Sequence, residues 1–466
     1  KTKEFELFSE GGGNTWGLDF DKHGQIISGT NWGGFACLHQ MQGAYYVKGF
    51  SKHGPLHNPH AYGYLEHIPY KDFKGGHVTC GGIVYQGDTF PEEYRDQYIA
   101  GNLLSNAVYM HKLEPNGSTF KARHGADLLV ANDTWFRPVD LLVGPDGSVY
   151  VADWYDKRAA HLDPVDNWDR TNGRIYKIEY KGTPQFPTFD LRKKPSADLV
   201  ELLKHENKWW RNEARRILAE RKDETVYTKL DRWVRHQKRQ LALEALWALY
   251  ASGGCEWGTV KVAARHANPH VRAWAIRLIE ETADPQMTEK HWLNEVVDPN
   301  ESDPVALAQL ACTAKRLNPK LAEQLAWLIL NSPRSADDPQ LQVLAWWAIE
   351  SGIARGQEGF ARDILTEHFQ IKRFAFVAER IFRRHMAEPS NQVLGKLIHR
   401  LRNDIHPDGM LAALRGILKS LEYDTTIYSK VNQSVVDEIA LMRKPLANDP
   451  LLTEVLFRLR ETKTVR

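Results

Sequence analysis

The sequence predicts an all-β plus all-α multidomain chain, in which a partial β-propeller of about three blades precedes a HEAT/armadillo-like α-solenoid. Short apolar runs separated by turn residues recur through the first part of the chain, whereas helix-starting Asx-Pro pairs recur through the second. A length of 466 residues also exceeds what one hydrophobic core organises. We therefore expect the C-terminal blades of a propeller in residues 1–182, a linker in 183–195 and helical repeats in 196–466.

The strand pattern is clearest between residues 135 and 178. Residues 141–143 (LLV) form a short apolar run, 144–147 (GPDG) form a tight-turn sequence, and 149–152 (VYVA) form a β-branched and aromatic run. Residues 174–178 (RIYKI) form a third run of the same kind. We expect these runs to be three strands of one antiparallel sheet.

Similar units occur earlier in the chain. One combines residues 18–20 (LDF) with 25–28 (QIIS), and another combines 82–85 (GIVY), 98–100 (YIA) and 107–110 (AVYM). Units of short strands at this spacing are typical of propeller blades. A closed propeller needs roughly four to eight blades, so an upstream segment or another chain is expected to supply the missing ones.

Proline, glycine and helical periodicity mark the change to the second half. Gly182 and three prolines interrupt regular structure between residues 181 and 195. The pairs at 268–269, 303–304 and 338–339 each place Asn or Asp before Pro and lie 35 residues apart. Proline suits the first turn of a helix, where its missing N–H would be unpaired anyway. Earlier copies begin near residues 209 and 239, which predicts a solenoid of paired helices.

Composition excludes several classes. The 61 basic and 59 acidic side chains give a net charge of +2, which lacks the basic field typical of nucleic-acid binding. No run of apolar residues is long enough for a membrane span, and the first residues show no signal region. The four cysteines form no C-x-x-C, so there is no haem attachment motif; Cys37 and Cys80 are either a disulfide or buried thiols.

Polar side chains crowd at the ends of the predicted strands, where core packing does not need them. Arg137 and Asp140 precede the first strand of the 135–178 stretch, and Asp153, Asp156 and His161 follow the second. Arginine can clamp a carboxylate or a quinone oxygen, and neighbouring aspartates can hold Ca²⁺ or orient a histidine. We expect Arg137, Asp140, Asp153 and His161 to bind a cofactor and Asp156 to bind a metal.

His77 is the expected catalytic base. It precedes a strand, as Arg137 does, and can reach the same face of the sheets. A histidine accepts protons near neutral pH.

Structural roles compete with these functional ones. Asp146 and His23 stand just before turn glycines and are expected to be turn residues. Asp153 can equally end a strand by binding a loop backbone, and Arg137 can equally tie two blades together. The cluster of four histidines at 53, 57, 60 and 67 is expected to be a solvated loop rather than a metal site. The recurring tryptophans of the second half are expected to pack in a core (Trp209, Trp210, Trp247, Trp274, Trp346 and Trp347).

An ordered set of short motifs carries a family resemblance. The motifs are 82–88 (GIVYQGD), 90–95 (FPEEYR), 135–138 (WFRP), 144–155 (GPDGSVYVADWY) and 173–176 (GRIY). In this order they resemble the membrane-bound dehydrogenases of planctomycetes and verrucomicrobia, which combine a propeller similar to glucose/sorbosone dehydrogenases with HEAT repeats. The resemblance covers residues 14 to about 180 by motif and the remainder by architecture alone.

The resemblance implies a periplasmic or exported quinoprotein-like dehydrogenase that oxidises a sugar or an alcohol. Its cofactor would be pyrroloquinoline quinone (PQQ), with Ca²⁺ beside it and a cytochrome c as electron acceptor. His77 would take the proton of the substrate hydroxyl and Arg137 would polarise the quinone. Two alternatives remain open: a non-catalytic propeller–solenoid that binds a glycan or a protein, and a glycan-cleaving enzyme that uses the aspartates.

Overall fold

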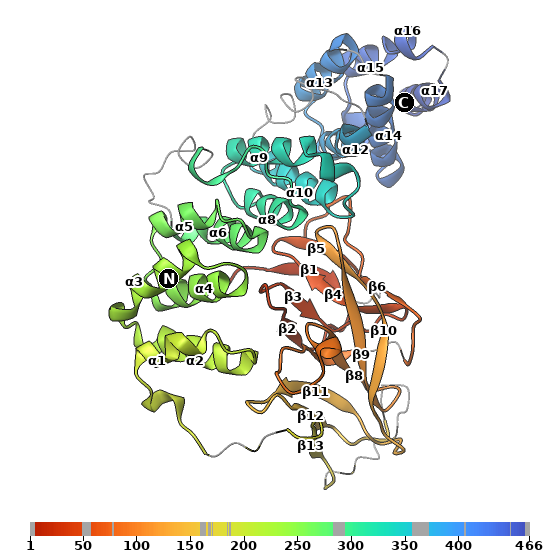
Figure 1. Ribbon diagram of the computed structural model, residues 1–466. Helices are drawn as coiled ribbons and strands as arrows, with labels where there is room; N and C mark the ends of the chain where they lie inside the picture. The colour runs from red at the N-terminus through yellow and green to blue at the C-terminus, as the bar shows by residue number, and fades with distance from the viewer. Residues whose placement is uncertain are drawn as a thin grey trace. The chain divides into compact units, whose positions relative to one another are not determined.

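The computed structural model describes residues 5–48, 57–76, 79–158, 165, 169, 171–183, 185, 188–282, 294–356, 372–404, 407–447 and 449–461. A β domain is followed by a helical domain (Figure 1). The chain forms two compact units, Lys1–Leu56 with Tyr64–Asp298 and His57–Gly63 with Pro299–Arg466. The first unit thus holds the β domain and the first helices, and the domain limits at 182 and 196 stay a prediction.

Three sheets make up the β domain within the described ranges. A small sheet pairs β1 with β5 in parallel, a larger one has the order β2-β3-β4-β6-β10-β9-β8-β7, and a third has the order β11-β12-β13. The strands are β1 (Ser9–Gly12), β2 (Leu18–Phe20), β3 (Ile26–Ser28), β4 (Phe35–Gln40), β5 (Ala44–Lys48), β6 (Ile68–Lys71), β7 (Cys80–Val84), β8 (Tyr98–Asn102), β9 (Ala107–Asn116), β10 (Thr119–Val130), β11 (Pro138–Val143), β12 (Val149–Asp153) and β13 (Arg174–Ile178).

The predicted sheet of residues 135–178 is confirmed. β11 pairs with β12 and β12 pairs with β13, both antiparallel. Gly147 closes the turn between β11 and β12 with a φ of 74°, which a glycine adopts without steric cost. The Asp146 carboxylate accepts a hydrogen bond from the Ser148 N–H (3.1 Å), so Asp146 is a turn residue as predicted.

The two earlier units do not form separate sheets. Their strands are also confirmed, but β2–β3 and β7–β9 belong to one eight-stranded sheet. The long strand β10 causes this continuity, because it pairs with β9 on one side and in parallel with β6 on the other. Three separate blades are therefore not observed, and the propeller stays a prediction.

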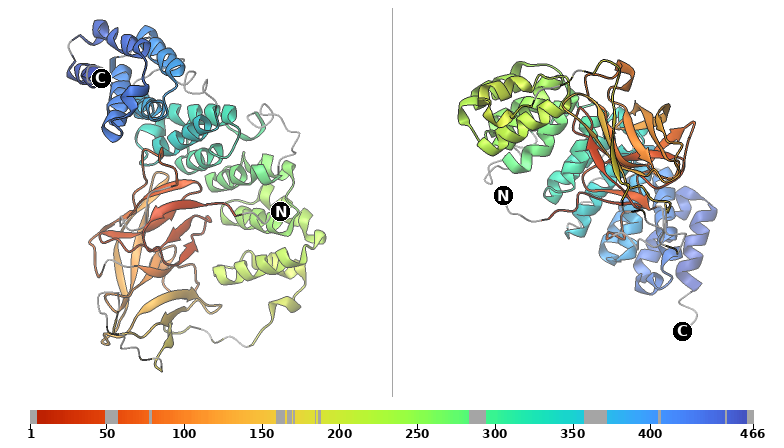
Figure 2. Two further views of the ribbon diagram at one scale, coloured as in Figure 1. Left: turned by 180° about the vertical axis from the view of Figure 1, so that it is seen from behind. Right: turned by 90° about the horizontal axis from the view of Figure 1, so that it is seen from below.

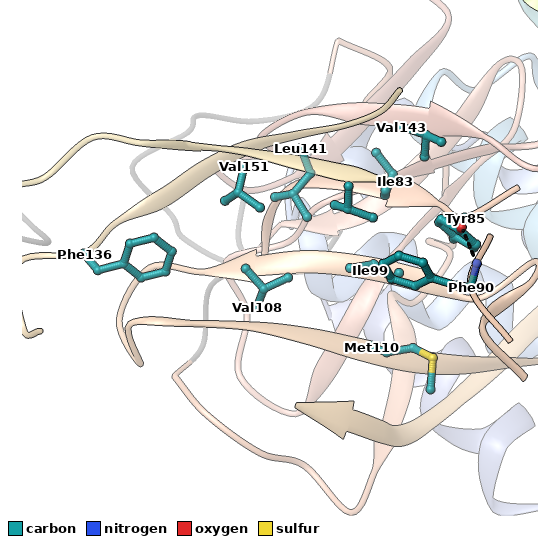
Figure 3. Packing of buried hydrophobic residues seen from close by; sticks show 11 residues of the cluster. Ile83, Tyr85, Phe90, Ile99, Val108, Met110, Phe136, Leu141, Val143 and Val151 are labelled. Carbon is teal, nitrogen blue, oxygen red and sulfur yellow. Dashed lines mark hydrogen bonds between the residues drawn. The ribbon is translucent and has the colours of Figure 1, made fainter. Parts of the chain in front are cut away.

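A hydrophobic core joins the third sheet to β7–β9. Ile83, Ile99 and Val108 from the larger sheet face Leu141 and Val151 from β11 and β12 (Figure 3). Each of these side chains is at least 96% removed from solvent. Burial of branched apolar side chains at roughly 1.5–3 kcal/mol each holds the two sheets face to face. The ends of β11 and β12 are thereby fixed in position.

Paired helices follow the β domain in the first unit. α1 (Ser196–Leu202), α3 (Tyr227–His236) and α5 (Trp257–Ala263) pack against α2 (Lys208–Arg221), α4 (Gln240–Ser252) and α6 (Pro269–Thr282), respectively. Neighbouring pairs also touch, α4 lying against both α2 and α6 (Figure 2). The helix starts predicted near residues 209, 239 and 269 are confirmed, whereas the HEAT or armadillo class stays a prediction.

The second unit continues with further helices. α8 starts at Pro304 as predicted, whereas α10 starts at Leu341, two residues after Pro339. The delay has a local cause: the Asp338 carboxylate accepts hydrogen bonds from the N–H groups of Gln340 and Leu341. The helices are α8 (Pro304–Ala314), α9 (Pro319–Asn331), α10 (Leu341–Ala354), α12 (Lys372–Ala387), α13 (Asn391–Asp404), α14 (Pro407–Tyr423), α15 (Gln433–Ala440), α16 (Arg443–Leu446) and α17 (Pro450–Glu461).

A seven-residue piece of the N-terminal half, His57–Gly63, belongs to this second unit. The Ala61 carbonyl accepts hydrogen bonds from the indole N–H groups of both Trp346 (2.7 Å) and Trp347 (2.9 Å), and all three residues are buried. Arg380 of α12 donates from Nε to the Tyr62 carbonyl (2.7 Å). The piece therefore completes the packing of α10 and α12.

The expectation of a solvated histidine loop is wrong for His60 and His67, whereas His57 is exposed as expected. His60 lies in the piece just described, with its Nε2 3.4 Å from the Glu388 carboxylate. His67 is buried in the first unit, where its Nδ1 pairs with the Thr30 hydroxyl (2.7 Å). His53 lies outside the described residues. Tertiary contacts account for the difference: His60 meets Glu388 just after α12, and His67 meets Thr30 and Val47 of the β domain. The Pro- and Gly-rich local sequence does not encode these contacts.

Candidate functional site at the strand ends

Asp153 closes the end of β12 onto the start of β11. Its Oδ1 accepts hydrogen bonds from the backbone N–H groups of Arg137 (2.8 Å) and Tyr155 (2.9 Å), and the side chain is buried. Pro138 and Asp153 are partners in the β11–β12 ladder. The Asp153 carboxylate therefore connects Arg137, just before β11, to Tyr155, just after β12. The structural role expected as an alternative for Asp153 is present here.

The Arg137 guanidinium binds three backbone carbonyls. Its Nη1 donates to the carbonyls of Leu103 (3.1 Å) and Phe136 (3.2 Å), and its Nη2 donates to that of Lys157 (3.0 Å). Burial lowers the pKa of Arg137 from its usual value, while the nearby Asp156 and Asp153 carboxylates act in the opposite direction. The guanidinium thus ties the β8–β9 turn and the loop after β12 to the start of β11.

Asp156 and Asp140 differ in burial and in partners. Asp156 is buried; its Oδ1 accepts from the Arg158 N–H (2.9 Å) and its Oδ2 from the Trp154 indole N–H (3.1 Å). Asp140 is exposed and accepts from the N–H of Leu141 (3.0 Å). Arg137, Asp153 and Asp156 are therefore brought together, whereas Asp140 points to solvent.

Two buried polar atoms at this end have no hydrogen-bond partner among the described residues. They are the Arg137 Nε and the Asp153 Oδ2. An unsatisfied buried donor or acceptor costs roughly 1–3 kcal/mol, so a hydrogen-bond partner at either atom would stabilise the fold. The pair provides one donor and one acceptor beside the strand ends.

The implied PQQ and Ca²⁺ find only part of a site in the described residues. His77 and His161 lie outside those residues, and Arg137 has three hydrogen bonds already committed to carbonyls. Across the described ranges no group of three or more His, Cys, Asp or Glu side chains is arranged to hold a metal. PQQ binding, Ca²⁺ binding at Asp156 and the base role of His77 stay predictions.

Aromatic residues at the same strand ends were not among the predicted site residues. Trp135 and Tyr155 have ring centroids 5.7 Å apart, and the Arg174 guanidinium lies 5.3 Å from the Tyr155 centroid. Trp154 is 50% exposed. The available sequence signal was the dipeptide Trp154-Tyr155 directly after the strand-ending Asp153, since an exposed aromatic ring can contact the apolar C–H face of a sugar.

The structure distinguishes between the two states expected for Cys37 and Cys80 and tests the expected core positions of the tryptophans. Cys37 and Cys80 are buried free thiols rather than a disulfide, and burial raises the pKa of Cys80 to about 12. Trp346 and Trp347 are fully buried, as expected for core residues. Trp247 and Trp274 are only partly buried and line a hollow in the first unit. Their spacing on successive helices is that of core residues, so the sequence did not indicate that they line a hollow.

Comparison with known proteins adds a domain family and a distant structure. Residues 1–182 match a family described as a domain of unknown function (DUF7133). No curated protein matches the chain. A crystal structure from Thermus thermophilus, described as an oxidoreductase (glucose dehydrogenase), matches with a TM-score of 0.25 and 18% sequence identity. The match covers 36% of this chain and 46% of that structure, so less than half of the matched protein is spanned.

No described helix is long and apolar enough to cross a membrane.

Proposed function

We propose that the chain is part of a dehydrogenase that oxidises a sugar or an alcohol, with its site at the strand ends around Arg137 and Asp153. The ordered motifs between residues 82 and 176 support this class through their resemblance to a dehydrogenase family. The structural observation that carries the proposal is the buried Arg137 Nε and Asp153 Oδ2, each without a partner in the described chain. A bound ligand would satisfy both atoms.

The proposed division of roles follows from the residue chemistry. His77 is the proposed base for the substrate hydroxyl, because imidazole is neutral and basic near pH 7. Arg137 and Asp153 would orient an oxygen-bearing ligand, and the exposed Trp154 ring would contact its apolar face. PQQ is the proposed cofactor, Ca²⁺ its proposed companion ion and a cytochrome c the proposed acceptor, all in an exported protein.

A turnover assay on the full chain tests this proposal. The protein is supplied with PQQ and Ca²⁺, and a panel of sugars and alcohols is screened with an artificial electron acceptor. We expect turnover that requires PQQ and falls about 100-fold or more in His77→Ala, the usual contribution of a general base. The matched control is His399→Ala, since His399 lies on α13 and its side chain is 55% exposed. Absence of PQQ binding, or equal turnover in His77→Ala, would remove the dehydrogenase assignment.

A non-catalytic binding protein for a glycan or a protein is the second candidate. The observation that favours it is the commitment of Arg137, Asp153 and Asp156 to loop backbone, which leaves few free groups for chemistry. In that case sugars of the same panel bind saturably, and the artificial electron acceptor is not reduced.

A further inference from the structure

A hollow of about 320 Å³ lies within the first compact unit. Its walls come from β2 and the loop after it, from Gln86 after β7, and from helices α2, α4 and α6. Phe20, Arg215, Trp247 and Trp274 are among the lining residues. Ligand pockets usually measure roughly 300–1,000 Å³, so this one suits a small ligand. It is separate from the strand-end residues Arg137 and Asp153, which are not part of its lining.

The aromatic wall of the hollow is held in place. Trp247 and Trp274 meet edge to face with centroids 5.4 Å apart, and the Trp274 indole N–H donates to the His23 carbonyl (2.7 Å). Gly24 packs directly against both indoles: a Cβ there would come within 2.6 Å of Trp274 and 2.9 Å of Trp247. The two rings are thus fixed before any ligand arrives. Pre-organised aromatic rings of this kind reduce the entropy lost on binding.

At one place in the wall, two positively charged side chains share a single carboxylate. Glu244 is buried and accepts from both the Arg211 Nε (2.9 Å) and the Arg215 Nη1, so two guanidinium groups share one carboxylate. Arg211 is fully engaged, because its other nitrogens donate to Gln86 and to backbone carbonyls. Arg215 donates its Nη2 to the neutral Asn212 Oδ1 (2.6 Å) and is the more exposed of the two, at 23% against 8% for Arg211, so the surplus charge is more accessible at Arg215. Its guanidinium lies 5.2 Å from the Trp247 centroid.

The other charged groups of the lining are already paired. Lys208 donates to the Asp19 carboxylate and to the Val84 carbonyl (3.1 Å). Asp21 accepts from the backbone N–H groups of His23 and Gln25, and Lys22 pairs with Asp96 outside the hollow. The lining holds four basic and three acidic side chains, but the Asp96 partner of Lys22 balances the count. The charge surplus is therefore local to Arg211 and Arg215, which share Glu244, and an anionic group is favoured over a cationic one beside them.

One buried donor in the wall also needs an acceptor. The indole nitrogen of Trp247 has no hydrogen-bond partner in the described part of the chain. An oxygen atom, from water or from a ligand, is what such a donor requires. The wall therefore combines flat apolar rings, a donor that suits oxygen and a cation that suits a carboxylate.

We propose that this hollow binds a carboxylated sugar of the uronic-acid type. One face of the sugar ring would stack on one of the two indoles, a hydroxyl oxygen would accept from the Trp247 N–H, and the carboxylate would pair with Arg215. Neutral sugars lack the carboxylate, and aromatic acids lack the hydroxyl oxygens. The proposal does not depend on the dehydrogenase assignment, because it concerns different residues and a binding reaction alone.

Titration of the full chain with galacturonate, followed by calorimetry or tryptophan fluorescence at low salt, tests the proposal. We expect saturable binding that is about tenfold weaker for galactose and about tenfold weaker in Arg215→Gln, equivalent to about 1.4 kcal/mol for the lost ion pair. Arg216→Gln is the matched control, because Arg216 is the next residue on α2 and pairs with Glu213 and Glu220. Its affinity should equal that of the unaltered chain.

Three outcomes of the sugar titrations would overturn the assignment. They are no saturable binding of galacturonate, equal affinity for galactose, or unchanged affinity in Arg215→Gln with its fold intact by thermal unfolding. Tighter binding of benzoate than of galacturonate would replace the sugar by an aromatic acid and also reject the proposal. All arms are measured without PQQ or an electron acceptor, so a failure here is distinct from a failure of the turnover assay.

Discussion

Arg137 holds three chain segments together with one side chain, and this sets the expected effect of changing it. We expect Arg137→Gln to lower the free energy of unfolding by about 2–4 kcal/mol, because three carbonyls lose a charged donor in a buried place. Arg137→Lys should restore less than half, since a single ammonium cannot span the three acceptors. Urea unfolding measures both. Arg123→Gln, whose side chain is 46% exposed, should change the value by less than about 0.5 kcal/mol.

His39 makes the β domain sensitive to acid. Burial lowers the pKa of His39 to about 4, although Asp21 acts in the opposite direction, whereas an unfolded histidine titrates near 6.5. Below pH 6.5 the unfolded chain takes up a proton that the folded chain takes up only near pH 4. Stability should therefore be constant above about pH 6.5 and fall between pH 6.5 and 4, by up to roughly 3 kcal/mol for this residue.

The measurement is urea unfolding at pH 7 and pH 4.5, compared with His39→Gln. Glutamine keeps a polar group near Thr119, to which the His39 Nδ1 is bound at 3.1 Å, but does not titrate. The variant should lose less stability at the lower pH than the unaltered chain. Identical losses would show that other groups, such as the buried His111, cause the whole effect.

Residue chemistry predicted Asp146 but not the partners of Arg137. An aspartate before a turn glycine binds the N–H two residues on, which depends only on local sequence. The acceptors of Arg137 are backbone carbonyls, one of them at Leu103, 34 residues earlier. Every residue carries such a carbonyl, so side-chain identity cannot point to it.

At the scale of elements, helix starts were the best-encoded feature. Asp303 caps α8 by accepting from the N–H groups of Val305 (2.9 Å) and Ala306 (3.4 Å), and Pro304 follows it. Capping residue and proline are both local signals. The eight-stranded sheet was not predicted, because the pairing of β10 with β6 joins strands that are not consecutive in the chain.

We expect Asp303→Ala to lower the free energy of unfolding by about 1 kcal/mol, because the first turn of α8 loses its side-chain acceptor. Asp303→Asn keeps an oxygen in the same place and should stay within about 0.5 kcal/mol of the original. Thermal or urea unfolding followed by circular dichroism distinguishes the two. Equal destabilisation by both substitutions would show that the charge of Asp303, rather than its capping bond, is what matters.

For the whole molecule, the order of a β domain and a helical domain could be predicted, and the composition of the compact units could not. Periodicity reports each element separately, and nothing in residues 57–63 signals a place beside α10 and α12. The hollow beside Trp247 and Trp274 was missed for a similar reason. Its walls come from the β2–β3 loop and three helices, and only the folded chain brings them together.

We expect the exchange of residues 57–63 for a flexible Gly-Ser linker to destabilise the second unit. A flexible linker does not hold a backbone carbonyl in place between the indoles of Trp346 and Trp347, and the buried Ala61 would be replaced by chain that does not pack. Faster proteolysis of α10 and α12 and a changed tryptophan emission would report the loss. Tyr64→Ser, at an exposed residue next to the segment, is the control and should leave both readouts unchanged.

The Ala61 carbonyl and the Trp346 indole are separated by 285 residues, and this distance has a consequence during synthesis. At about 5–20 residues per second, a ribosome needs roughly 15–60 s to pass from one to the other. The segment around Ala61 leaves the ribosome first and must stay accessible for that time. Translation speed and chaperones that hold nascent chains are therefore expected to affect how much of this protein reaches its finished form.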